Sequence, residues 1–121
     1  MGVAAGILII VISIAHNIYG ERKQVPALKK ITNDSIMIGS LRIMIFQGGI
    51  LLLGVGVIQV LAAVNMIELS GISTFFPLGI VLINFITSLS IASIFHREVL
   101  KITVPQFVVF AIIIILQMLS F

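Results

Sequence analysis

The chain has 121 residues, of which 60% are apolar and only 9% are charged, and its formal net charge is +3 at pH 7. Soluble domains are about half apolar and a quarter charged, so this composition excludes an ordinary soluble globular protein. The sequence contains no cysteine, which excludes disulfides, thiolate nucleophiles and cysteine-ligated metal centres. These features predict a small integral membrane protein.

Four apolar segments predict one transmembrane domain over residues 1–121. We expect spans at about residues 3–19, 38–67, 78–95 and 104–121, with cytoplasmic loops at 20–37 and 96–103. A span needs about 20 apolar residues, so four spans leave no room within these residues for a soluble catalytic domain. Pro77 and Pro105 suit the first turns of the third and fourth helices, where a missing N–H does no harm. The predicted fold class is all-α, an antiparallel four-helix transmembrane bundle.

The positive charges predict how these spans are oriented. All seven lie in or beside the first and third connections, at Arg22, Lys23, Lys29, Lys30, Arg42, Arg97 and Lys101. Short basic loops stay in the cytoplasm, so we expect a multi-pass protein of the plasma membrane with both termini outside. Because topology explains the basic charge, membrane lipids are expected partners and nucleic acid is not.

Small and polar residues within the spans predict surfaces for helix packing. Asn84, Ser88 and Ala92 recur every four residues and therefore share one face of the third helix. Gly2 and Gly6 form a similar small surface on the first helix. Such residues let helices approach closely and hydrogen bond in lipid, so both surfaces are candidate interfaces with another helix or a partner chain. A path for a polar substrate along the third helix is the alternative.

Four residues near the cytoplasmic ends of the spans are candidates for chemistry. His16 and His96 could ligate haem or a metal, or His16 could pass protons with Glu21. A third histidine and any cysteine are lacking, so we predict no metal, no cofactor and no catalytic site. Glu21 and Arg42 end the first span and begin the second on the same side, where we expect them to form an ion pair.

The stretch from Ala15 to Glu21, followed by Arg42 at the start of the second span, resembles a group of small four-span bacterial and archaeal membrane proteins of unassigned function. Members share a histidine, a Gly-Glu pair and an arginine, and some carry a second histidine after the arginine, where this chain has Gln47. The size and Ile-rich, Lys-biased composition are also similar to accessory membrane subunits of archaeal complexes such as ammonia monooxygenase. The positions that match the pattern of the four-span group are His16, Gly20, Glu21 and Arg42.

Taken together, these features favour a non-catalytic accessory subunit of a larger integral membrane complex. Four spans with almost no mass outside the membrane are typical of a protein that packs against others. A small homo-oligomeric transporter or a lipid-interacting membrane protein is the alternative. A membrane redox protein with histidine-ligated haem or metal is a third.

Overall fold

The computed structural model describes residues 1–121, and its ordered elements are all helical, without a strand. The long helices are α1 (Gly2–Tyr19), α3 (Ser35–Ala63), α4 (Phe76–Ile94) and α5 (Arg97–Leu119). The short elements are η1 (Gly20–Gln24), α2 (Val25–Lys29) and η2 (Gly71–Phe75). Four helical segments, counting short elements with the long helix beside them, are long and apolar enough to cross a membrane. The chain therefore has the architecture of a multi-pass membrane protein.

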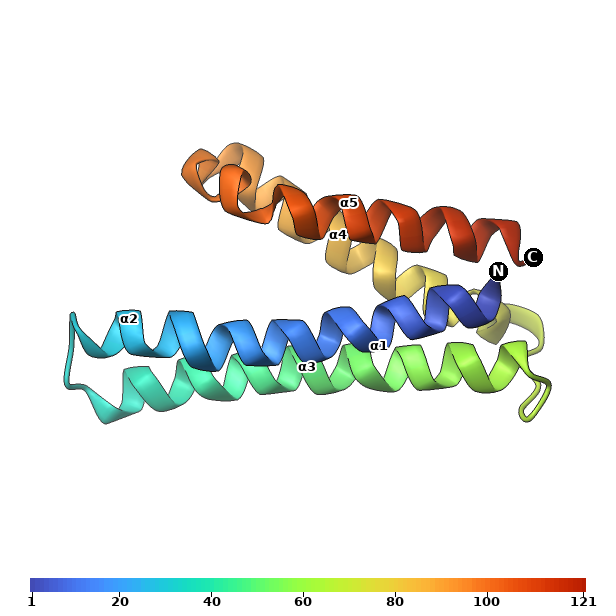
Figure 1. Cartoon of the computed structure of the whole chain (residues 1–121), viewed down its shortest axis with the longest axis horizontal. Coiled ribbons are helices and arrows are strands. Elements are labelled where there is room, and N and C mark those ends of the chain that lie inside the picture. The colour runs from blue at the N-terminus through green and yellow to red at the C-terminus, as the bar shows by residue number, and fades with distance from the viewer.

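The first connection is shorter than the expected loop at 20–37. The π-helical η1 joins α1 to α2, so the helical path continues from Gly2 to Lys29 (Figure 1). Pro26 lies in the first turn of α2, where its missing N–H is tolerated. Asp34 then caps α3 by accepting a hydrogen bond of 3.0 Å from the Ile36 backbone N–H. The basic residues of this region therefore lie mostly on helix rather than in a flexible loop.

Two other helix boundaries also differ from the expected ones. α3 ends at Ala63 because Asn65 adopts a left-handed backbone with φ of 59°, a conformation common just after a helix C-terminus. α5 begins at Arg97, so Pro105 lies inside this helix rather than in its first turn. The expectation for Pro77 is met, since it lies in the first turn of α4.

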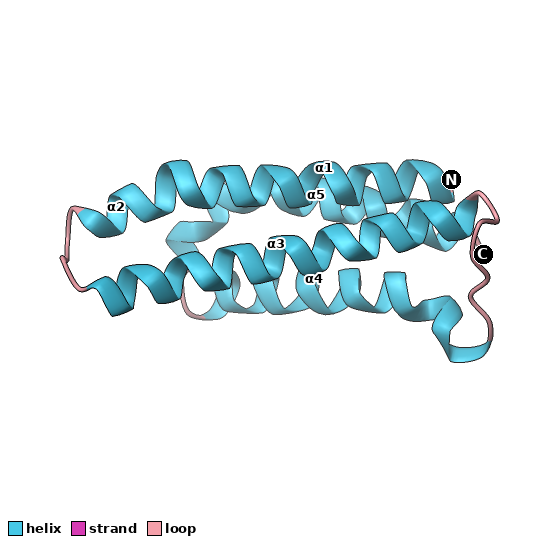
Figure 2. Ribbon diagram, turned by 90° about the horizontal axis from the view of Figure 1, so that it is seen from below, coloured by secondary structure: helices cyan, strands magenta, loops and turns pink.

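The four long helices form two pairs that pack against each other. α1 packs along α3 and α4 packs along α5, while contacts of α1 with α5 and of α3 with α4 join the pairs. The pairs lie closest near the two chain termini, which are at the same end of the molecule, and they diverge toward the α4–α5 connection (Figure 1). Figure 2 shows the same helices from below.

An apolar core joins all four long helices, whereas the outer rim also exposes large apolar side chains. Gly6 and Gly56 bring the backbones of α1 and α3 together, since a Cβ on Gly6 would lie only 3.0 Å from Gly56 O. The exposed rim, which includes Ile7, Ile50 and Ile83, suits a lipid surrounding. The core consists of Ile9, Leu52, Val55, Val81, Phe110 and Ile113.

Candidate functional site

Glu21 in η1 and Arg42 in α3 form a bidentate ion pair. Arg42 Nη2 lies 2.7 Å from Glu21 Oε1, and Arg42 Nε donates to Glu21 Oε2 at 3.2 Å. The pair is partly open, with exposed side-chain fractions of 47% for Arg42 and 37% for Glu21. Gly20 makes the close approach possible, because a Cβ there would lie 2.5 Å from Ile45 Cγ2. This ion pair links the end of the first span to the start of the second.

His16 and His96 line different cavities and do not face a common ligand position. His16 lines a cavity of about 90 Å³ beside Gly48. His96 immediately precedes α5 and makes no side-chain capping hydrogen bond, and its Nδ1 lies 3.8 Å from Glu98 Oε1. No cluster of three or more His, Asp or Glu side chains is close enough to hold a metal ion. The two histidines thus stand as separate polar groups at the diverging end of the bundle.

The two small-residue surfaces mostly face other helices of the same chain. A Cβ on Gly2 would lie 3.0 Å from Ala63 Cβ, so Gly2 packs on α3 as Gly6 does. On α4, Ala92 is buried and Ser88 is half-buried. Asn84 is exposed and donates its Nδ2 hydrogen bond to Ile80 O at 2.9 Å, one turn earlier on its own helix. These surfaces therefore serve packing between helices of the chain before they serve a partner.

Polar side chains line a cavity between the two helix pairs and an adjoining cavity between α4 and α5, and we call the two together the inner crevice. It consists of two adjoining cavities of about 90 and 270 Å³, which share Ser88 and Gln106. α1, α3, α4 and α5 all contribute to its lining. Its polar residues are His16, Asn84, Ser88, His96, Thr103 and Gln106.

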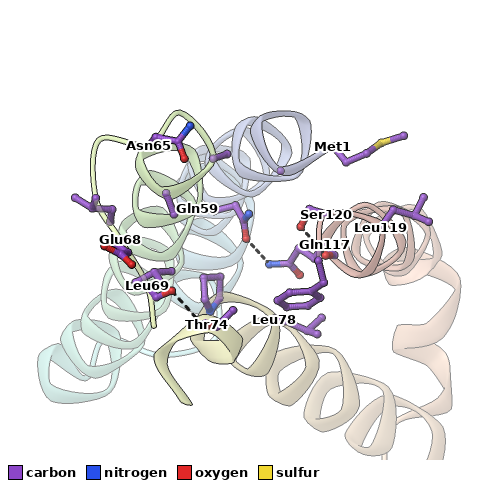
Figure 3. Close-up of a pocket in the computed structure, with 16 residues that line it drawn as sticks. Met1, Gln59, Asn65, Glu68, Leu69, Thr74, Leu78, Gln117, Leu119 and Ser120 are labelled. Carbon is purple, nitrogen blue, oxygen red and sulfur yellow. Dashed lines mark hydrogen bonds between the residues drawn. The ribbon is translucent and has the colours of Figure 1, made fainter. Parts of the chain in front are cut away.

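A second polar region, which we call the outer pocket, lies at the end of the molecule that holds both termini. Its volume is about 490 Å³, and Gln59, Gln117, Thr74 and Glu68 contribute to its lining (Figure 3). Sequence reasoning did not bring Gln59 and Gln117 together. The signal was available, because each lies within the last turns of its helix.

A layer of buried apolar side chains separates the inner crevice from the outer pocket. Along each long helix, at least one buried apolar residue lies between the residues that line the two regions. On α3, for example, Val55 lies between Leu52 in the crevice and Gln59 in the pocket. Each member of the layer is at most 1% exposed. The layer consists of Ile9, Val55, Val81 and Ile113.

Comparison of the chain with protein-family models, with curated proteins and with solved structures finds no match in any of the three. The resemblance carried by His16, Gly20, Glu21 and Arg42 remains an expectation.

Proposed function

We propose that the chain is a non-catalytic subunit of a larger integral membrane complex and that α4 carries its docking surface. One observation supports this proposal: α4 exposes polar side chains in the middle of a membrane-spanning helix. Thr87 and Ser90 are exposed and lie on one stripe with two isoleucines that are 63% and 70% exposed. We call this stripe the outer α4 surface, made of Ile83, Thr87, Ser90 and Ile94.

Membrane physics explains why this surface favours a protein partner over lipid. Acyl chains offer no hydrogen bonds, so hydroxyl groups facing them gain nothing, whereas a neighbouring helix can accept or donate. Ser and Thr are also small enough to let a second helix approach closely. α4 fully buries only Pro77, Val81 and Ala92 within the chain, so one side of this helix remains free for contact. We infer a partner helix that presents small and hydrogen-bonding residues.

The proposed arrangement in the membrane is an antiparallel bundle with both termini outside the plasma membrane. Two independent features support it. All seven Lys and Arg lie in or beside the first and third connections, which favours a cytoplasmic location for those connections. Both termini lie together at the opposite end of the molecule (Figure 1), and the ion pair of Glu21 with Arg42 lies near the basic end.

Leucine substitutions on α4 test the docking proposal. The double variant Thr87→Leu/Ser90→Leu keeps the helix compatible with lipid but removes the hydroxyl groups and blocks close approach. We expect the variant to insert and to unfold at the temperature of the wild type, but to lose the stoichiometric partner that the wild type retains on purification from native membranes.

The matched control is Ala15→Leu, which also adds bulk at a small, exposed position, but on α1. It should keep the partner. Retention of the partner by the α4 double variant, or purification of the wild type without any stoichiometric partner, would contradict the proposal.

A small homo-oligomeric transporter is the second candidate, and the apolar layer favours it. Transporters that work by alternating access place their substrate site near the middle of the bilayer, between bundles that rock against each other, and here the apolar layer separates two cavities lined by all four long helices. Thinning this layer by Ile113→Ala should then increase the flux of small polar solutes through protein reconstituted in liposomes. Equal flux through wild type, variant and empty liposomes would exclude this candidate.

A further inference from the structure

The outer pocket contains a buried polar atom without a partner. Gln117 is 1% exposed, and its Nε2 donates to Gln59 Oε1 at 3.1 Å across the bundle, from α5 to α3. Its own carbonyl oxygen, Oε1, is buried and accepts no hydrogen bond. A buried acceptor left unpaired costs about 1–3 kcal/mol. The pocket therefore holds a hydrogen-bond acceptor that a ligand carrying N–H or O–H groups would satisfy.

The charges around the outer pocket favour a cation among such ligands. Glu68 lines the pocket and is the one acidic side chain at this end of the molecule. No Lys or Arg occurs between Arg42 and Arg97. This segment includes the connection from α3 to α4, which lines the pocket. Met1, which also lines the pocket, is 65% exposed and forms no ion pair. The pocket thus combines the Glu68 carboxylate with carbonyl acceptors.

Apolar residues also line part of the pocket, beside the polar residues Asn65, Thr74 and Ser120. Pro77 and Leu78 come from the first turn of α4, and Leu119 and Phe121 come from the end of the chain. Figure 3 shows Gln59 and Gln117 pointing toward each other in the middle of this group, with Leu78 beside Gln117. A volume of about 490 Å³ lies within the range of about 300–1,000 Å³ that is usual for small-molecule sites.

We propose that the outer pocket binds a small organic cation of the primary alkylammonium class. The ammonium group donates a hydrogen bond to Gln117 Oε1 and is attracted by the Glu68 carboxylate. The alkyl chain lies against Pro77 and Leu78. This assignment is independent of the docking surface on α4, because the two sites share no residue.

Binding of hexylammonium to the purified full chain in detergent, measured by isothermal titration calorimetry, tests this site. Hexyltrimethylammonium has the same charge and chain but no N–H donor, and hexanol has the same chain without charge. We expect hexylammonium to bind about tenfold or more tightly than either, as a charge-assisted hydrogen bond predicts. Equal affinity for the three compounds, or no binding of hexylammonium at millimolar concentration, would overturn the proposal.

Variants locate the site. Gln117→Met keeps the length of the side chain and removes the carbonyl, so hexylammonium affinity should fall about tenfold or more. Glu68→Gln, at an exposed position, should weaken binding while leaving the fold intact. Gln106→Met makes the same change in the inner crevice and should leave affinity unchanged. Unchanged affinity in both Gln117→Met and Glu68→Gln, or an equal loss in Gln106→Met, would place the ligand elsewhere and refute the site.

Discussion

Adding one methyl group at Gly6 should destabilise the protein by forcing α1 and α3 apart. A Cβ at this position would lie 2.5 Å from Val60 Cγ2 and 3.0 Å from both Gly56 O and Val60 N. The valine methyl can rotate away, but the two backbone atoms cannot, so the helices themselves must shift. Overpacking costs about 1–3 kcal/mol, and alanine regains about 1 kcal/mol in helix propensity, so Gly6→Ala should lower the free energy of unfolding by up to about 2 kcal/mol.

Gly54→Ala is the matched control, because no atom lies within 4 Å of a Cβ at that position of α3. It should raise the free energy of unfolding by up to about 1 kcal/mol, through helix propensity alone. The assay is titration of the protein in detergent micelles with sodium dodecyl sulfate, followed by circular dichroism. If both substitutions changed the free energy in the same direction and by the same amount, the close packing of α1 on α3 at Gly6 would be refuted.

Three further predictions concern the ion pair, the topology and the proline inside α5. Glu21→Arg and Arg42→Glu should each destabilise the protein by about 1 kcal/mol or less, and the double reversal should restore stability in the same titration; a double variant no better than the worse single one would contradict the ion pair. A cysteine at Ser73 should react with an impermeant thiol reagent added outside cells and one at Thr32 should not, whereas labelling at Thr32 would invert the topology. Pro105→Ala should raise the thermal unfolding temperature, because it returns an N–H to the interior of α5; an unchanged or lower temperature would show that this proline costs α5 nothing.

The number and approximate position of the spans could be predicted because hydropathy is a local property. An apolar segment long enough to cross the membrane is visible without knowledge of its neighbours. The polar ends of the helices were harder to predict. Residues 20–29 form helix although Gly20 and Pro26 favour an interruption, because η1 absorbs an extra residue per turn and Pro26 falls where a first turn tolerates it. Likewise, α5 starts eight residues before Pro105, in a charged segment that hydropathy excluded.

The faces of the helices could not be predicted, for a reason specific to membranes. Lipid-facing and core-facing residues are equally apolar, so periodicity does not distinguish the inside of the bundle from the rim. The spacing of Asn84, Ser88 and Ala92 marked a shared face but not its direction, which is toward the inner crevice. The meeting of Gln59 with Gln117 depends on which helices oppose each other, and that is a property of the whole bundle.

The central claim, that α4 docks on another membrane chain, is tested most directly by photo-crosslinking in native membranes. A benzophenone amino acid placed at Ser90 lies on the outer α4 surface, and the same group placed at Ala15 faces outward from α1. We predict that the Ser90 probe gives one protein adduct of defined mass, formed with the chain that co-purifies with the wild type, and that the Ala15 probe gives none. Only lipid adducts at Ser90, or the same protein adduct from both positions, would contradict the claim.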